Sequence, residues 1–489
     1  MFCSSLRNGA TKPMMEVQRP GTNEVMITSA QIEARAETLK QAMAGFMPLI
    51  RAIAAGGDDR ALSQRNAAVA FLVRCTSAFL LYVTQIAMAR WMGSAEYGIY
   101  VFVWTCVLMA GALSHLGLAL GIIRLIPVHR EAGEHDHLRG LVDGGRAFAL
   151  AAGSIVAFAG IAGLWLFEPY VSSTYRLAAY LALVCIPLYA LTDVQDGIGR
   201  GNGWMSAALV PPYVMRPLLL LVFMGIAYLA GWPMVATTAA KAAIAATWAT
   251  GLIQAVWINR AMAATYGRGS RSYAPRAWMV SSLPLLAISG CEILLQNTDI
   301  VVLSRFMTPT DVGIYFAAGK TMSLIMFVHY AVGSAMANRF ASFSARGDTQ
   351  GLRDAVRDAV NWTFWPSLAA AVLILALGKP LLSLFGPQFV AGYPVMAILV
   401  FGFLARSAMG PAEFLLNMQG EQRLCAVVML SAAAVNILLN LILVPRYGII
   451  GAATATTIAL TMAAVLNAAV ARWRLGVDVA IWRNVSGRS

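Results

Sequence analysis

A short stretch near the start of the chain recurs 215 residues later, and each copy lies at a turn between two long apolar segments. Residues 90–100 align with residues 305–315 without a gap. Five aligned positions are identical, namely Arg90 and Arg305, Met92 and Met307, Gly98 and Gly313, Ile99 and Ile314, and Tyr100 and Tyr315. A membrane chain made of two related halves is typical of transporters whose binding site lies at the interface of the halves.

The apolar segments are too long and too numerous for the core of a soluble protein. Hydrophobic residues occupy 59% of the 489 positions and charged residues only 12%, whereas soluble domains carry about 25% charged residues. A bilayer-spanning helix needs about 20 mostly apolar residues. Windows of that length predict twelve spans, at 66–89, 98–125, 141–166, 176–195, 206–229, 234–258, 279–303, 313–339, 358–377, 392–415, 424–444 and 448–472. We therefore expect an all-α polytopic membrane protein of about twelve transmembrane helices, in two homologous six-helix lobes around a central cavity.

The repeat and the spans divide the chain into five expected parts. These are a cytoplasmic N-terminal extension at 1–61, an N-lobe at 62–258, a cytoplasmic linker at 259–278, a C-lobe at 279–472 and a cytoplasmic tail at 473–489.

The extension has apolar residues at helical spacing, which predicts an amphipathic helix over 29–54 lying on the cytoplasmic membrane surface. The alternatives are a poorly ordered tail, or an upstream start assigned in error, with Met14, Met15 or Met26 as candidate starts.

The distribution of basic residues indicates the orientation. With the N-terminus inside, 24 of the 36 Lys and Arg residues lie on the cytoplasmic side and five on the opposite side. The positive-inside rule therefore places both termini in the cytoplasm. The net charge of +13 is explained by this orientation, and since no nucleic-acid motif accompanies it, we expect no nucleic acid as a partner.

Neither a metal site nor a cofactor site is expected. The six cysteines are scattered without paired spacing, which predicts neither disulfides nor metal ligation. The glycine-rich segment 197–203 lacks the phosphate-loop pattern and a preceding strand, so ATP hydrolysis is not expected either. No residue is predicted to be catalytic.

Four basic residues within the spans are the main candidates for a binding site. A charged side chain at the centre of a membrane helix costs roughly 2.5 to 3.5 kcal/mol on insertion scales, so it normally faces a protein interior or a watery cavity. Arg74, Arg216 and Arg406 are each flanked by apolar residues, and Lys320 lies one to two turns into its helix. We predict that they form a cationic cavity. Pro211, Pro212 and Pro217 surround Arg216 and favour an irregular helix there.

Four further residues are weaker candidates. Arg124 and Arg339 occupy equivalent helix ends near the cytoplasmic face, where anchoring at the membrane surface is the preferred interpretation. His115 and His329 lie within helices 2 and 8, almost at the repeat offset. Either histidine can titrate in a cavity near neutral pH, although a hydrogen-bonded packing role is the commoner outcome.

Carboxylates within the spans suggest ion coupling. Glu292 and Asp299 are seven residues apart and therefore share one helix face. They can bind a coupling cation or pair with Arg74, and a fixed ion pair between helices is the alternative. Asp193 lies at a helix end, where a solvated loop boundary is the preferred interpretation, and Glu413 is ambiguous.

Several segments carry a family resemblance. Residues 89–100, 299–315 and 436–454 resemble the bacterial polysaccharide transporter family, the oligosaccharide flippases of the multidrug/oligosaccharidyl-lipid/polysaccharide exporter superfamily. The resemblance covers roughly 62–475 and is moderately specific for the family, but it does not identify the cargo.

The resemblance implies a function. It implies a non-enzymatic, multi-pass transporter of the bacterial inner membrane that moves an undecaprenyl-pyrophosphate-linked oligosaccharide from the cytoplasmic to the periplasmic leaflet by alternating access. The product would enter O-antigen, capsule or exopolysaccharide synthesis. Membrane lipids are implied partners, with a polysaccharide polymerase or assembly proteins as further candidates. Related flippases use basic cavity residues, which Arg74 and Lys320 match, whereas Arg216 and Arg406 follow from their place in apolar helices alone.

Two kinds of alternative remain open. A cation-coupled multidrug exporter of the same superfamily would favour an acidic cavity. A membrane enzyme or a scaffold of polysaccharide assembly is the alternative of a different class, but an enzyme would ordinarily need a larger extramembrane segment than the sequence offers.

Overall fold

The described part of the chain is helical. The structure is a computed structural model that describes residues 59–170 and 172–482, in which no strand occurs. The predicted amphipathic helix over 29–54 lies outside the described residues. The elements are α2 (Asp59–Ser114), α3 (Leu118–Glu131), α4 (His135–Leu166), η1 (Glu168–Tyr170), α5 (Ser173–Leu183), α6 (Ile186–Gly201), α7 (Met205–Val210), η2 (Pro211–Met215), α8 (Arg216–Leu229), α9 (Ala236–Tyr266), α10 (Pro275–Phe306), α11 (Pro309–Ala345), α12 (Thr349–Ala376), α13 (Gly378–Phe385), η3 (Pro387–Gly392), α14 (Tyr393–Ala408), α15 (Ala412–Met418) and α16 (Gln422–Leu475).

The helices are long and apolar enough to cross a membrane repeatedly. Eight helical segments of the described chain meet the length and hydropathy requirement, and two bent pairs raise this number to ten. Two of the segments contain a glycine with a non-helical backbone, Gly93 (φ 76°) in α2 and Gly448 (φ 56°) in α16. If each glycine separates two spans, every one of the twelve predicted spans has a counterpart. The predicted class, an all-α polytopic membrane protein, is confirmed.

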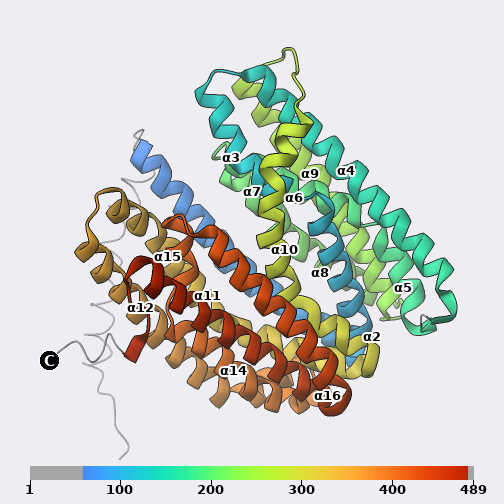
Figure 1. Ribbon diagram of the computed structural model, residues 1–489. Helices are drawn as coiled ribbons and strands as arrows, with labels where there is room; N and C mark the ends of the chain where they lie inside the picture. Colours follow the sequence, from blue (N-terminus) through green and yellow to red (C-terminus); the bar gives the residue numbers. More distant parts are fainter. Residues whose placement is uncertain (1–58, 171, 483–489) are drawn as a thin grey trace, which may run out of the picture. The chain divides into compact units, whose positions relative to one another are not determined.

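From residue 66 onward the helices belong to one compact unit, and within it they pack in two groups. One group contains α3, α4, α6 and α9, and the other contains α11, α12, α14 and α16. Figure 1 shows the first group in cyan to green and the second in gold to red. The helix α10 packs against both α16 and α3. These groups follow the order of the two repeats, and the predicted lobe boundaries stay a prediction.

The helix α10 is bent where it passes from one group to the other. Its pieces Pro275–Ala287 and Ser289–Phe306 meet at 40°. The first piece lies against α3, because a Cβ on Gly117 would meet the Ser282 carbonyl oxygen at 2.5 Å. Glycine is needed at this contact because no larger residue allows so close an approach.

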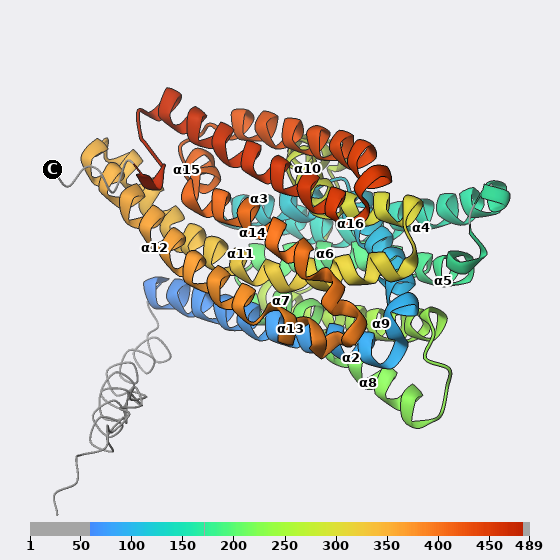
Figure 2. The ribbon, with the colours of Figure 1, turned by 90° about the horizontal axis from the view of Figure 1, so that it is seen from below.

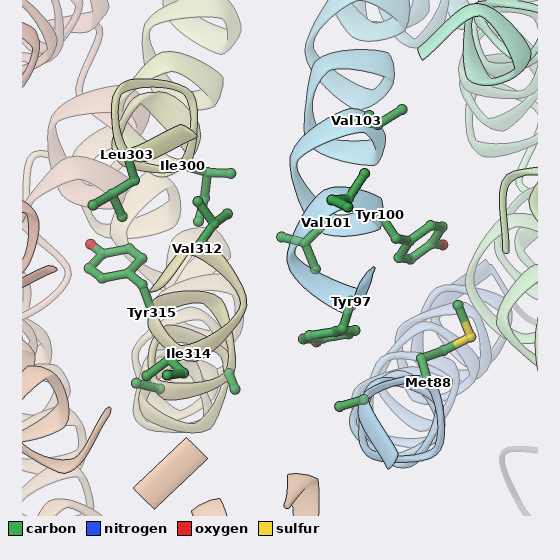
Figure 3. Packing of buried hydrophobic residues seen from close by; sticks show 14 of the residues in the cluster. Met88, Tyr97, Tyr100, Val101, Val103, Ile300, Leu303, Val312, Ile314 and Tyr315 are labelled. Atoms are coloured by element: carbon green, nitrogen blue, oxygen red, sulfur yellow. The ribbon is translucent and has the colours of Figure 1, made fainter. Parts of the chain in front are cut away.

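The two repeat turns join the groups through a shared apolar core. Gly98 of α2 lies against the start of α11, since a Cβ there would be 1.7 Å from the Pro309 carbonyl oxygen and 3.0 Å from the Gly313 nitrogen. Tyr97 and Tyr315, 0% and 2% exposed, belong to the same buried cluster (Figure 3). The sequence repeat therefore corresponds to a packing surface between the halves.

Many large apolar side chains lie on the outside of the helices. Phe158, Trp165, Leu229, Phe401 and Trp473 are each more than half exposed. A soluble protein rarely leaves so many large apolar groups in contact with water. Their exposure fits helices whose outer faces contact lipid.

Candidate functional site

A cavity between α2, α8, α9 and α11, here called the N-side cavity, contains two basic residues. Its volume is about 230 Å³, and its lining includes Arg216 and Lys320. None of the residues that line it, in the part of the chain that the structure describes, is Asp or Glu. Gln85, Thr84 and Thr247 add uncharged polar groups, among aromatic and aliphatic neighbours. The balance of charge in this cavity favours an anionic ligand.

A second cavity, the C-side cavity, lies within the other group of helices. Its volume is about 290 Å³, and it is lined by residues of α10, α11, α14 and α16. Asp299, Lys320 and Arg406 are its charged lining residues. Phe316 and Lys320 line both cavities. The ammonium group of Lys320 is thus shared between a cavity without carboxylates and one that contains Asp299.

Arg216 lies at the end of an irregular helical segment. Residues Pro211–Met215 form a π-helix, and α8 begins at Arg216. The guanidinium carbon is 4.9 Å from the centre of the Tyr189 ring, a cation–π distance. The irregular helix predicted from the three prolines is confirmed. Single π-turns often occur at functional sites, because they displace side chains from regular helical positions.

Lys320 has an aromatic neighbour but no close carboxylate. Its Nζ is 4.9 Å from the centre of the Phe316 ring. In the described chain no Asp or Glu oxygen comes within the 4.0 Å of an ion pair with Lys320. Its charge is therefore available to a ligand of either cavity.

Arg406 forms an ion pair with Glu413. Its Nη2 donates to both carboxylate oxygens of Glu413, at 2.6 and 2.7 Å. The break between α14 and α15 allows this contact across seven residues. Arg406 lines the C-side cavity as a neutralised pair, which weakens its predicted role as a free cationic group. The ambiguity of Glu413 is also resolved, because its carboxylate forms a buried ion pair.

Arg74 lies apart from the other three predicted cations. Its side chain is exposed, and its guanidinium carbon is 4.6 Å from the centre of the Tyr213 ring. Arg74 is not among the residues that line either cavity, whereas Tyr213 lines the N-side cavity. Of the predicted four, the structure places Arg216 and Lys320 in the N-side cavity, and Lys320 and the paired Arg406 in the C-side cavity, whereas Arg74 lines neither.

The two predicted coupling carboxylates contact hydroxyl groups, and neither forms the alternative pair with Arg74. Tyr315 donates to the Asp299 carboxylate at 2.5 Å, and Tyr330 donates to Glu292 at 2.9 Å. Asp299 is buried and Glu292 is half-buried. Figure 3 shows the Tyr315 hydroxyl directed toward α10, the helix that carries Asp299.

Next to the contact of Tyr315 with Asp299, further polar side chains extend into α16. Reasoning from charge alone missed these residues. Thr456 lines the C-side cavity with Tyr315. Asn436 donates to the Thr456 hydroxyl at 3.4 Å, and Asn440 donates to the side chain of Asn436 at 3.1 Å. Both asparagines are fully buried. Their spacing of four residues within an apolar helix was the available signal, since buried amides in membrane helices usually contact one another.

The weaker candidates separate into two kinds. Arg124 and Arg339 are exposed and line neither cavity, and their anchoring at the membrane surface stays a prediction. His115 and His329 are buried, with 6% and 1% of the residue exposed. Each histidine lies near a carboxylate, His115 near Asp193 and His329 near Glu413.

Comparison with known proteins identifies the family. A family model described as polysaccharide biosynthesis protein matches residues 63–343, which is more than half of the chain. The chain belongs to this polysaccharide biosynthesis protein family. A second family model, MatE, matches residues 284–442. The family predicted from the turn and late-helix segments is thereby confirmed, and its apolar helices are those of a multi-pass membrane protein.

Two relatives of this polysaccharide biosynthesis protein are described as a transporter and a flippase. A Shigella flexneri protein described as an O-antigen transporter is 22% identical over 396 residues, which cover 78% of this chain and 90% of the relative. A Haloferax volcanii protein described as the low-salt glycan biosynthesis flippase Agl15 is 25% identical over 174 residues. That match covers 35% of this chain and 36% of the relative, so this chain spans about a third of the length of the Haloferax protein.

Solved structures support the fold of this family member. An inward-facing multidrug resistance transporter of the MATE family has a TM-score of 0.68 at 16% identity, and the match covers 86% of this chain and 100% of the other. The lipid II flippase MurJ in an inward closed conformation has a TM-score of 0.63 at 14% identity, with 85% and 88% covered. At such identities the likeness shows the fold alone.

Proposed function

We propose that this protein is a flippase that moves a lipid-pyrophosphate-linked oligosaccharide from the cytoplasmic to the periplasmic leaflet of a bacterial inner membrane. The observation that carries the proposal is the presence of Arg216 and Lys320 in one cavity without a lining carboxylate. A pyrophosphate cannot cross hydrocarbon unaided, and paired cations compensate its charge through charge-assisted hydrogen bonds. The polar and aromatic lining of the same cavity suits sugar hydroxyls and ring faces. The lipid tail would remain in the bilayer.

Contacts between the two sequence halves support alternating access. Arg90 donates to the backbone carbonyls of Leu384 at 2.6 Å and Ser383 at 2.7 Å, and Figure 2 shows α13 alongside α2. Ser94 donates to Gln388 at 2.5 Å. If both termini are cytoplasmic, as the distribution of basic residues predicts, these contacts would lie at the periplasmic end. They would then hold that end closed, and opening toward the periplasm would require them to break.

A coupling ion is proposed for the C-side cavity at Asp299. This carboxylate is buried, lines a cavity and is held by Tyr315. Binding or release of a cation there would change the charge between α10, α11 and α16, which is a means of linking ion flow to helix movement. Glu292 would act with it or serve only to hold Tyr330.

The test is direct transfer of cargo in sealed vesicles that contain the purified protein and a labelled undecaprenyl-pyrophosphate oligosaccharide. We expect Arg216→Gln and Lys320→Gln each to slow transfer by roughly tenfold or more, since a hydrogen bond to a charged group contributes about 1.5 to 3 kcal/mol. Arg124→Gln is the matched control, because Arg124 is exposed and outside both cavities. Absence of protein-dependent transfer across a range of glycans would contradict the proposal. Wild-type rates in both cavity variants would contradict the role of the cavity.

A cation-coupled drug exporter is the second candidate, favoured by the MatE match over 284–442 and by Asp299 in the C-side cavity. The same vesicles separate the two candidates if a lipophilic cationic dye replaces the glycan. Dye transport that depends on Asp299, without glycan transfer, would favour export of drugs. An assembly scaffold would instead support polysaccharide synthesis in cells even when Arg216 and Lys320 are replaced together.

A further inference from the structure

Each half of the protein places a histidine beside a carboxylate at equivalent helices. His115 Nε2 is 3.5 Å from an Asp193 carboxylate oxygen, and His329 Nε2 is 3.5 Å from a Glu413 carboxylate oxygen. The histidines lie on the second helix of each half, almost at the repeat offset. The carboxylates lie on the fourth, in the second piece of a broken span, α6 and α15. Each half therefore contains a histidine–carboxylate pair in a similar place.

The two pairs differ in the partners that their carboxylates have besides the histidine. Glu413 accepts two hydrogen bonds from Arg406, so its charge is already paired. In the described chain no hydrogen bond or ion pair joins Asp193 to any residue other than His115. The Asp193 side chain is 32% exposed, against 17% for Glu413. Only the pair in the first half has a carboxylate that is free for its histidine and accessible to solvent.

The two pairs also differ in the backbone at the histidine. The helix α2 ends at Ser114 and α3 begins at Leu118, so His115 lies in the break between them. Leu116 has φ 50°, and it is the one non-glycine residue with positive φ in the described chain. A left-handed conformation is unfavourable for leucine and marks local strain. By contrast, α11 continues without a break through His329. His115 is therefore at a strained joint in a membrane helix.

Other charged groups near this pair have contacts of their own. On α6, Asp196 is 3.3 Å from Arg200 in an ion pair. Arg216 of α8 contacts the ring of Tyr189, and Arg74 of α2 contacts the ring of Tyr213. The face of α10 that meets the joint contributes Ser282 and Leu286 against Gly117, neither of them charged. The Nδ1 atom of His115 is buried without a hydrogen-bond partner.

We infer that His115 and Asp193 form a proton-binding site that couples proton movement to bending of the second helix. A proton from the aqueous phase that reaches Asp193 would pass to the imidazole, without any other bond forming or breaking. The imidazolium would then gain an ion pair with Asp193 that neutral histidine lacks. Histidine changes charge between about pH 5 and 8, and the strained joint beside it can adopt a second geometry. The inference deepens the proposed function, on which it rests, by naming the proton as a coupling ion.

The test measures conformation without cargo. Spin labels at Glu131→Cys and Arg346→Cys, both exposed, are introduced into protein whose six native cysteines have been replaced. The distance distribution between the labels is recorded by electron–electron resonance from about pH 8 to about pH 5. We expect the distribution to shift with pH in the parent protein and in His329→Gln. We expect the shift to be lost in His115→Gln and in Asp193→Asn.

The outcomes separate this inference from the proposed function. If the distance distribution of the parent protein does not change with pH, the inference is overturned, even if the protein transfers glycan. A pH-dependent shift that persists in both His115→Gln and Asp193→Asn would also overturn it. If His115→Gln does not reach the membrane, loss of the pH-dependent shift in Asp193→Asn is sufficient to support the site. Failure of glycan transfer with the predicted pH response would instead contradict the proposed cargo and leave the proton site standing.

Discussion

Gly98 and Gly313, the same position in the two sequence repeats, pack directly against each other. A Cβ on Gly313 would lie 3.3 Å from the Gly98 nitrogen, and one on Gly98 would lie 3.0 Å from the Gly313 nitrogen. The identical glycines are therefore explained by contact between the halves, in addition to any role within each turn. This contact lies at the end of the protein where Arg90 reaches the backbone of α13.

We predict that Gly98→Ala weakens the contacts that we propose to close the periplasmic end, because its Cβ would overlap the Pro309 carbonyl oxygen at 1.7 Å. Overpacking of this kind costs about 1 to 3 kcal/mol. Labelling of a single cysteine at Ser323 by a membrane-impermeant reagent added from the periplasmic side should become faster. Gly163→Ala is the matched control, since a Cβ at Gly163 meets nothing within 4 Å. Equal labelling in the two variants would contradict the role of this contact.

We predict that Arg90→Gln also favours opening at the periplasmic end. The substitution removes a charged donor from the carbonyls of Ser383 and Leu384, a loss of about 1.5 to 3 kcal/mol per bond at most. The cysteine-labelling measurement at Ser323 reports the change. Arg305→Gln is the control from the other repeat, because Arg305 contacts the ring of Phe306 rather than backbone carbonyls. The prediction is wrong if both arginine variants label alike.

We predict that Glu413→Gln destabilises the protein strongly. It leaves the buried Arg406 charge without its counter-ion, and breaking a buried pair in this way costs about 3 to 5 kcal/mol. Thermal unfolding in detergent should show a clear fall in the midpoint. Glu421→Gln is the control, because its pair with Arg474 is partly exposed, and such pairs contribute about 0 to 1 kcal/mol. Similar midpoints for the two variants would show that Arg406 finds other compensation.

We predict that Tyr315→Phe changes the ion dependence of transfer. The variant removes the 2.5 Å hydrogen bond to Asp299 and leaves that buried carboxylate with a hydrogen bond from the Ile300 backbone nitrogen. The dependence of the transfer rate on sodium concentration and on pH should differ from that of the wild type. Tyr100→Phe is the control at the equivalent position of the first repeat, where Thr84 replaces the aspartate. An unchanged ion response would remove Asp299 from the coupling mechanism.

Local patterns were enough for several predictions. The spans follow from apolar segments of bilayer length, and the irregular segment before Arg216 follows from Pro211, Pro212 and Pro217, because proline acts on its own helix. The family followed from the turn at 89–100 and the late helices, where the order of residues carries the information.

Charge within an apolar segment identified candidates but not their partners. Arg216 and Arg406 have similar apolar flanks, yet Arg216 lines a cavity without carboxylates and Arg406 is paired with Glu413. The free energy of a charge depends on the groups within a few ångströms, and these come from other helices. His115 and His329 likewise differ through Arg406 and through the backbone break at Leu116.

The amino-acid sequence by itself determined that this chain crosses a membrane as two related helical halves, because hydropathy and repetition are properties of order along the chain. Only the tertiary structure decided that Arg216 and Lys320 meet in one cavity, since they lie on different helices in different halves. It also decided that Gly98 meets Gly313. Distances across helices depend on how the two halves pack, and no local pattern contains that information.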